Sequence, residues 1–308
     1  MRIIITGGTG LIGTALALDL VAEGHEVIAL SRTPETRNGL PGEVRLAGWD
    51  ARSAEGWGHL ADGADAIVNL AGANLAGGGF LPSRWTDERK RILRDSRVNA
   101  GRAVVDAVRQ AERKPGVVVQ ASGAGYYGFR DDGPLTEDAG PGDDFLARLA
   151  ADAWEPSTAA VEEMGVRRVI TRSGAVLDAG EGALPRMVLP FRLFVGGPMG
   201  RGDQWLPWIH LQDEVAAIKF LIEQEEASGP YNLAAPQSST NAQFGRALAR
   251  VLDRPYWLPL PGFAMRLAFG EVSDVLLEGQ RLSPRRIQEL GFAFRFPDAE
   301  SALRDLLG

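Results

Sequence analysis

The chain has 308 residues, of which 45% are hydrophobic and 24% are charged, and its formal net charge is −7. This composition is typical of a soluble globular protein with a sizeable core, and the acidic balance excludes a general nucleic-acid binder. The absence of cysteine excludes disulfides and thiolate chemistry, and three histidines far apart in sequence predict no metal site.

The first expected element is a short buried strand over residues 2–6, followed by a glycine-rich loop and a helix over residues 11–23. Because the strand starts at residue 2, we expect no signal peptide. No apolar run approaches the roughly 20 residues that a membrane-crossing helix needs. The sequence therefore predicts a cytoplasmic protein with no membrane partner.

Strand-like and helix-like segments alternate along the rest of the first half. Apolar strands are expected at residues 25–31, 43–50, 65–72, 116–123 and 167–176, with helices at 85–111 and 145–164. Strands that are apolar throughout and alternate with helices are typical of a parallel sheet covered on both faces. After about residue 178, loops rich in Gly and Pro precede a helix at 210–226, a strand at 229–235 and two or three helices in 239–308.

The prediction is an α/β fold, a doubly wound parallel Rossmann sheet with a smaller C-terminal α+β substrate lobe. The Rossmann dinucleotide-binding domain is expected over residues 1–177, with 208–235 returning to it. The substrate lobe would be formed by 178–207 and 236–308. A cleft is expected between the two, at the C-terminal ends of the strands.

The loop TGGTGLIG joins the first strand to the first helix. Gly7, Gly10 and Gly13 fit G-x-x-G-x-x-G, and Gly8 extends the match to the tighter G-x-G-x-x-G. Glycines there allow a tight turn, close approach of the backbone to a pyrophosphate, and close helix–strand packing. The helix starting near Leu11 would direct its free N–H groups at the phosphates. A glycine-rich turn that holds no ligand is the alternative, but the loop's place in the alternating chain favours dinucleotide binding.

The end of the second strand indicates which dinucleotide. NAD sites usually place an acid about 20 residues beyond the glycines, where it holds the ribose 2′-hydroxyl. Here Ser31 and Arg32 occupy that stretch, and no acid lies between Glu26 and Glu35. Arg32 suits a 2′-phosphate through its planar fork, and a solvated loop cation is the alternative. The sequence therefore favours NADP(H) over NAD(H).

Together with WD (49–50), NLAG (69–72), RVNAGRAV (97–104) and WIHLQDEVAAI (208–218), this loop resembles the extended short-chain dehydrogenase/reductase superfamily. The sequence is most similar to one atypical branch, the bacterial epimerase family proteins, also labelled nucleoside-diphosphate-sugar epimerases or cell-division-inhibitor-like proteins. That similarity is carried by ASGAGYYG (121–128), TRSGAVL (171–177), GGPMGRGDQWLPWIH (196–210) and the tail 276–307. The tail resembles the branch's own C-terminal domain, whose function is unassigned.

The resemblance implies a set of NADP(H)-binding residues: the glycine loop, the end of the second strand, an adenine-side pair, the fourth-strand motif and a structural asparagine. In this sequence they are Gly7, Thr9, Gly10, Leu11, Ile12, Gly13, Ser31, Arg32, Trp49, Asp50, Leu70, Ala71, Gly72 and Asn99. Members of the superfamily often form dimers through helices that flank the sheet, so a homodimer is also an expectation.

The superfamily's catalytic pattern is missing. A tyrosine there donates the proton, and a lysine four residues on lowers its pKa. No Tyr-x-x-x-Lys occurs in this sequence. The helix that should carry the pair, DDFLARLAADAWEPS (143–157), has Ala147 and Ala151, or Phe145 and Leu149, at the two places, depending on the alignment.

Ser122, Tyr126 and a bound water remain as candidate proton donors. Ser122 fits the superfamily's serine spacing only after a shift of one residue, and its alternative role is to cap the end of the fifth strand. Tyr126 and Arg130 give a Tyr-x-x-x-Arg spacing on a loop. His210 is a titratable alternative, but the resemblance implies that it holds the lobe junction.

The expected substrate lobe is locally basic, with six arginines and two acids in residues 166–201. An anionic substrate could be bound there by Arg186, Arg192 or Arg201, and solvated surface arginines are the alternative. Trp205 is expected to line the pocket. The acidic run over 131–144 is either a solvated loop or a lid over the nicotinamide.

The sequence thus predicts an NADP(H)-binding oxidoreductase or epimerase-like enzyme of the short-chain dehydrogenase/reductase superfamily. Its substrate would be a small molecule, anionic or of the sugar-nucleotide type, and its proton donor would differ from the usual tyrosine. The alternative is a non-catalytic NADP(H)-binding sensor, which the loss of both tyrosine and lysine supports.

Overall fold

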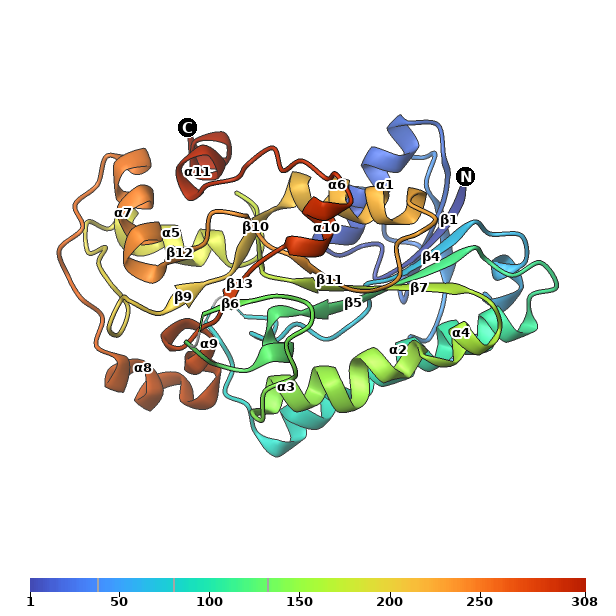
Figure 1. Ribbon diagram of the computed structural model, residues 1–308, viewed down its shortest axis with the longest axis horizontal. Helices are drawn as coiled ribbons and strands as arrows, with labels where there is room; N and C mark the ends of the chain where they lie inside the picture. Colours follow the sequence, from blue (N-terminus) through green and yellow to red (C-terminus); the bar gives the residue numbers. More distant parts are fainter. Residues whose placement is uncertain (38, 80, 132) are drawn as a thin grey trace.

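Figure 1 shows the computed structural model, which describes residues 1–37, 39–79, 81–131 and 133–308. In these residues, seven parallel strands form the main sheet, in the order β11-β7-β5-β4-β1-β2-β3. They are β1 (Arg2–Thr6), β2 (Glu26–Ser31), β3 (Arg45–Gly48), β4 (Ala66–Asn69), β5 (Val117–Gly123), β7 (Arg167–Ser173) and β11 (Gly229–Leu233). The strand order reverses between β1 and β4, which is where open α/β sheets bind ligands.

Helices cover both faces of this sheet (Figure 1). The longer ones are α1 (Leu11–Ala22), α2 (Asp87–Gln110), α5 (Leu184–Arg192), α6 (Leu211–Glu223), α7 (Asn241–Leu252), α8 (Gly262–Phe269) and α11 (Ala299–Leu307). The shorter ones are α3 (Phe145–Leu149), α4 (Ala160–Glu163), α9 (Asp274–Leu277) and α10 (Arg285–Glu289), with 3₁₀ turns η1 (Gly58–Ala61), η2 (Ala124–Tyr127), η4 (Glu155–Thr158) and η5 (Gly270–Ser273) and the π-helical turn η3 (Ala150–Trp154).

Successive side chains of a strand point to opposite faces of the sheet, so the apolar run of β1 contributes to two hydrophobic cores, one on each face. Ile3 and Ile5 of β1 point to one face, where they join the core that α1 and α6 cover. Ile4 points to the other face and packs in the core that α2 covers. Since all three isoleucines are fully buried, β1 is a central strand, and the doubly wound α/β fold is confirmed.

Three predicted elements differ from those observed. The helix expected over 145–164 is divided into α3, η3, η4 and α4. Pro156 lies in that stretch and lacks the N–H that a regular helix needs. The strand expected over 167–176 stops at Ser173, and Ala175 begins the separate strand β8 (Ala175–Leu177), which pairs with β10 (Trp208–His210). Residues 239–308 hold five α-helices rather than two or three.

The smaller lobe has a core of its own and lies at one end of the molecule (Figure 1). Phe191, Trp208 and Phe244 are buried in this core. The short strands β9 (Trp205–Leu206) and β12 (Ser239–Thr240) pair antiparallel in this lobe, whereas β13 (Arg281–Leu282) pairs with β6 (Pro134–Leu135). The lobe is tied to the sheet domain through Asp213, whose carboxylate accepts the N–H groups of Arg295 and Phe296.

Candidate functional site

The glycine loop forms a tight cradle at the end of β1. A Cβ added at Gly13 would stand 2.3 Å from the carbonyl oxygen of Gly7 and 2.7 Å from the Cα of Gly8. Gly7 itself has φ of 66°, a left-handed conformation that favours glycine. These residues therefore need to be glycine for the backbone to pack this closely, as in a pyrophosphate-binding turn.

The start of α1 is open to a ligand. Gly10 is its N-cap, and no side chain of the described residues caps it. The N–H groups of the first helical turn have no acceptor within a helix, so they are available to an anion, which the helix dipole also favours. The helix has no acid in its first turn that would compete.

Strand register brings most of the predicted cofactor residues to one edge of the sheet. Thr6 of β1 is level with Leu30 of β2 and with Asn69 of β4. The residues that follow these three in sequence therefore emerge together at the C-terminal edge. The set contains Gly7, Thr9, Gly10, Leu11, Ile12 and Gly13 after β1, Ser31 and Arg32 at the end of β2, and Leu70, Ala71 and Gly72 after β4.

Side chains at the end of β2 differ in what they can contact. Ser31 is buried, and its hydroxyl accepts the N–H of Thr33 at 3.1 Å. Arg32 is exposed, and none of the described residues engages its guanidinium. Arg32 can therefore meet an anion at this edge without first breaking a protein contact.

The other predicted cofactor residues have more local surroundings. Trp49 is buried edge-on against Trp57, with ring centroids 6.0 Å apart. The Asp50 carboxylate accepts the N–H groups of Arg52 and Ser53, and the bond from Ser53, the largest influence, lowers the pKa of Asp50. Asn99 is half-buried and belongs to helix α2, not to the glycine loop. The assignment of Trp49, Asp50 and Asn99 to the cofactor stays a prediction.

A buried charged network stands at the C-terminal ends of β5 and β7. The Arg172 guanidinium makes a two-pronged contact with the Glu155 carboxylate, with both N···O distances 2.9 Å. The Ser122 hydroxyl donates to the same carboxylate at 2.7 Å. Arg172 also donates to the Tyr127 hydroxyl at 3.0 Å. All four side chains are at least nine-tenths buried, so charge and hydrogen bonds are satisfied within the protein.

The two candidate proton donors, Ser122 and Tyr126, both contact this network. The proton of Ser122 is directed at Glu155 rather than at open space. The half-buried ring of Tyr126 lies over the Arg172 guanidinium, 3.3 Å from ring centroid to Cζ. Neither candidate is among the described residues that line the main cavity, and their catalytic roles stay predictions.

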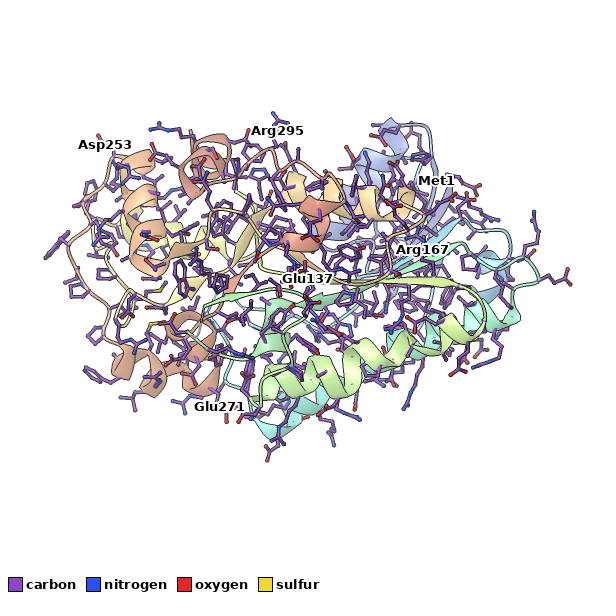
Figure 2. All side chains as sticks on the ribbon, in the orientation of Figure 1. Met1, Glu137, Arg167, Asp253, Glu271 and Arg295 are labelled. Atoms are coloured by element: carbon purple, nitrogen blue, oxygen red, sulfur yellow. The ribbon has the colours of Figure 1, made fainter. Side chains whose placement is uncertain are left out.

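The acidic run over 131–144 makes specific contacts with other parts of the protein. Asp132 lies outside the described residues. Glu137, near the middle of Figure 2, accepts the N–H of Asn232 at 3.0 Å. Leu135 pairs with Leu282 of β13. Burial raises the pKa of Glu137. These contacts join the run to β11 and to the C-terminal tail, and its role as a lid is untested.

Glu214 is a fully buried acid on α6. The Ser173 hydroxyl donates to its Oε1 at 2.6 Å, while its Oε2 has no partner among the described residues. Burial is the dominant influence and raises the pKa of Glu214 to about 7. This buried carboxyl therefore keeps its proton into the neutral range.

We expect Glu214 to make stability depend on pH. Between the unfolded pKa of 4.5 and the folded pKa of about 7, the folded state holds a proton that the unfolded state has lost. The free energy of unfolding should therefore fall by about 3 kcal/mol over that window as the pH rises. Urea unfolding of E214Q should lack this decline, leaving the variant more stable than the wild type at about pH 8. Equal slopes for E214Q and the exposed control E226Q would contradict this.

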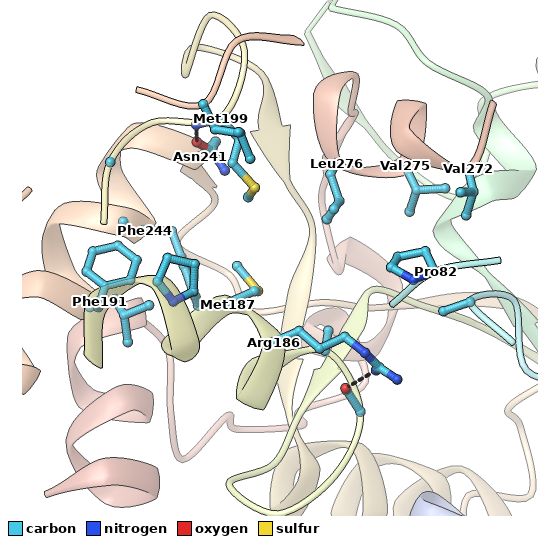
Figure 3. Close-up of a pocket in the computed structure, with 18 of the residues that line it drawn as sticks. Pro82, Arg186, Met187, Phe191, Met199, Asn241, Phe244, Val272, Val275 and Leu276 are labelled. Atoms are coloured by element: carbon cyan, nitrogen blue, oxygen red, sulfur yellow. Dashed lines mark hydrogen bonds between the residues drawn. The ribbon is translucent and has the colours of Figure 1, made fainter. Parts of the chain in front are cut away.

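A large cavity lies between the sheet domain and the smaller lobe, with a volume of about 750 Å³ (Figure 3). Ile12 of the glycine loop and Leu75, which follows β4, line it from the sheet domain. Phe191 of α5 and Phe244 of α7 line it from the lobe. The cavity therefore begins beside the cradle at the switch point of the sheet.

The predicted substrate residues are divided between this cavity and the surface. Arg186 lines the cavity, and its guanidinium donates to the carbonyl oxygens of Gly182 and Gly79. Arg201 is exposed and pairs with Asp203 at 3.0 Å. Trp205 lies outside this cavity; its indole N–H donates to Asp131 at 2.9 Å. Only Arg186 of these predicted residues is in the main cavity, and all three assignments stay predictions.

The sequence did not predict which groups of the protein Arg167 and Arg172 bind. Arg167 donates to the backbone carbonyls of Leu221, Ile222 and Ala227. Arg172 is held by Glu155. The buried strand around both arginines was the one signal that could have marked them as structural. His210 is also buried; it accepts the N–H of Gln212 and stacks on Phe296.

The described residues contain no group of three His, Cys, Asp or Glu side chains that could hold a metal ion. No helix among them is long and apolar enough to span a membrane.

Comparison with known proteins relates the chain to one family along most of its length. Residues 3–234 match the NAD dependent epimerase/dehydratase family, and residues 260–306 match a Domain of unknown function (DUF1731). The chain is 37% identical to "Epimerase family protein YfhF" of Bacillus subtilis over 308 residues, which is 100% of this chain and 98% of that protein. A Staphylococcus haemolyticus epimerase family protein is 36% identical over 99% of both chains.

Solved structures of epimerase family proteins and epimerases are also similar to this chain. The crystal structure of the human epimerase family protein SDR39U1 (isoform 2) with NADPH is 36% identical, with a TM-score of 0.87 over 99% of each chain. The Thermus thermophilus UDP-glucose 4-epimerase in complex with NAD is 20% identical, with a TM-score of 0.78 over 99% of this chain and 97% of that one. The second likeness is one of fold alone.

Proposed function

The chain belongs to the NAD dependent epimerase/dehydratase family, as an atypical short-chain dehydrogenase/reductase, and from that premise we propose that it is an NADP(H)-dependent oxidoreductase or epimerase-like enzyme that works without a Tyr-x-x-x-Lys pair. The observation that carries the proposal is that Ile12, in the first turn of α1 between the cradle glycines Gly10 and Gly13, also lines the large cavity. A small molecule in that cavity would lie beside whatever the cradle holds.

The residues present fit a dinucleotide phosphate. The cradle at Gly7 and Gly13 has no room for side chains, and the start of α1 offers free N–H groups to a pyrophosphate. Arg32, exposed at the same edge, would hold a 2′-phosphate. When bound, a nicotinamide cofactor supplies a hydride donor or acceptor. The relative crystallised with NADPH is 36% identical over nearly the whole chain, which supports NADP(H) as the form used.

We expect R32A to weaken NADPH binding about tenfold, since a surface guanidinium–phosphate contact contributes on the order of 1 kcal/mol. NADH lacks the 2′-phosphate, so its affinity should not change. Isothermal titration of both cofactors into both proteins checks this, with R45A as the control, because Arg45 is exposed at the start of β3 and so lies at the opposite edge of the sheet. Parallel losses for NADPH and NADH would show that Arg32 does not recognise the 2′-phosphate.

The proton needed at a substrate oxygen has two proposed sources, Tyr126 and a water in the cavity. Ser122 is the weaker candidate because its hydroxyl already donates a hydrogen bond to the Glu155 carboxylate. The same locked network favours the second function, an NADP(H)-binding sensor without turnover. Loading the protein with NADPH and screening carbonyl compounds and sugar nucleotides for nicotinamide oxidation separates the two. Oxidation of NADPH by any compound supports an oxidoreductase. An epimerase regenerates its cofactor and causes no net oxidation, so the protein loaded with NADP⁺ is also screened for epimerised sugar-nucleotide products, and tight cofactor binding with neither signal supports the sensor.

A further inference from the structure

The wall of the large cavity is almost wholly apolar. Among the described residues that line it, only Asn74, Arg186 and Asn241 carry polar side chains. The remainder are aliphatic side chains, methionines, phenylalanines, prolines, alanines and glycines. A volume of about 750 Å³ is in the range of sites for small organic molecules.

This wall is a poor match for a sugar nucleotide. A diphosphate and a ring of hydroxyls need many partners, and each buried polar group left without one costs about 1–3 kcal/mol. Arg186 is the one cation in the described wall, and its guanidinium already donates to two backbone carbonyls. Arg201, which was expected to bind an anionic substrate, and Trp205, which was expected to line the pocket, are not among the described residues that line this cavity.

Two side-chain amides of the wall, those of Asn74 and Asn241, have an Nδ2 that donates to no atom of the described residues. Asn241 is 5% exposed, and its Oδ1 accepts the N–H of Met199 at 3.0 Å (Figure 3). Its Nδ2 donates to no atom of the described residues. Asn74 is exposed, so Asn241 is the buried donor of the two, and a buried amide donor in an apolar chamber suits a ligand with an acceptor oxygen on a hydrocarbon body.

The C-terminal tail supplies one side of this chamber. Leu260, Val272, Val275 and Leu276 line it, and all four belong to the matched domain of unknown function. In Figure 3 the last three lie with Pro82 across from Met187 and Phe191 of α5. Without residues 260–276, the apolar chamber would lose that wall.

We propose that the cavity binds a hydrocarbon-bodied ketone, aldehyde or alcohol, and that the C-terminal domain serves to enclose it. This ligand class rests on the proposed function for its role as substrate, but the binding itself does not depend on NADP(H). The ligand's oxygen would accept a hydrogen bond from Asn241, and its hydrocarbon body would be buried between α5 and the tail.

The test uses the uncharged dye Nile red, whose fluorescence rises on transfer to an apolar site, with dodecan-2-one and UDP-glucose as competitors. The wild type should bind the dye, dodecan-2-one should displace it, and UDP-glucose should not. M187E and V275D place a charge in the cavity and should weaken dye binding at least tenfold, which corresponds to about 1.4 kcal/mol. L267D alters a side chain that is 76% exposed and outside the cavity wall, so it should bind the dye as the wild type does.

Two results would overturn the proposal: displacement by UDP-glucose, or dye binding that both cavity variants leave unchanged. Calorimetry with NADPH on the same proteins distinguishes failure of the proposed NADP(H)-dependent function from failure of the apolar ligand class. NADPH binding without dodecan-2-one binding removes the apolar ligand class alone. Dodecan-2-one binding without NADPH binding removes the proposed function and leaves the ligand class in place.

Discussion

Replacing Gly13 by alanine should abolish tight NADPH binding, with a loss of roughly 100-fold or about 3 kcal/mol of binding free energy. The new methyl group would stand 2.3 Å from the Gly7 carbonyl oxygen, so the loop and the start of α1 must move apart. That movement removes the cradle in which backbone N–H groups meet a pyrophosphate. Calorimetric titration with NADPH measures the effect.

A matched glycine separates this effect from a general change in stability. Gly42 has open space around its Cβ position and no positive φ, so G42A should bind NADPH as the wild type does. The fold should survive in G13A, because alanine is a better helix former than glycine. Unchanged NADPH affinity in G13A would contradict the placement of the pyrophosphate at this loop.

Replacing Arg172 by methionine should lower the free energy of unfolding by about 3–5 kcal/mol, because it leaves the buried Glu155 carboxylate without its cation. Arg172 is 4% exposed, and the variant also strips the Tyr127 hydroxyl of a donor. Urea unfolding of wild type and R172M measures the difference. The exposed Arg201–Asp203 pair provides the control, and R201M should change stability by less than about 1 kcal/mol.

The partner of Arg172 gives a second arm to this test. In R172M/E155L both charges are gone, so the double variant should regain part of the stability lost in R172M. If R172M were no less stable than R201M, the network at the ends of β5 and β7 would not be the anchor that its geometry implies.

The strands of the sheet and the glycine cradle could be predicted from the sequence because both are marked by residues that are neighbours in the chain. The apolar run at residues 2–6, the glycine spacing that follows it and the alternation of strands and helices each reflect neighbours in the chain. The carboxyl ends of parallel strands meet at one edge of a sheet, and the observed register of β1, β2 and β4 places Gly7, Arg32 and Leu70 there.

The buried network and the cavity could not be predicted in the same way. Ser122, Glu155 and Arg172 meet across separations of 17 and 33 residues, and nothing in their spacing marks them as partners. The cavity wall is drawn from segments between Ile12 and Leu276 that meet only in the folded chain. Composition did indicate a basic stretch, but it could not separate Arg167 and Arg172, which bind the protein itself, from cations available to a ligand.

We propose that the cradle between β1 and α1 holds NADP(H), with Arg32 beside it to recognise the 2′-phosphate. Isothermal titration of the wild type with NADPH and with NADH under identical conditions tests both parts of this proposal. We expect one site per chain and an affinity for NADPH that is about tenfold or more above that for NADH. Equal affinities, or no heat of binding with either cofactor, would contradict it.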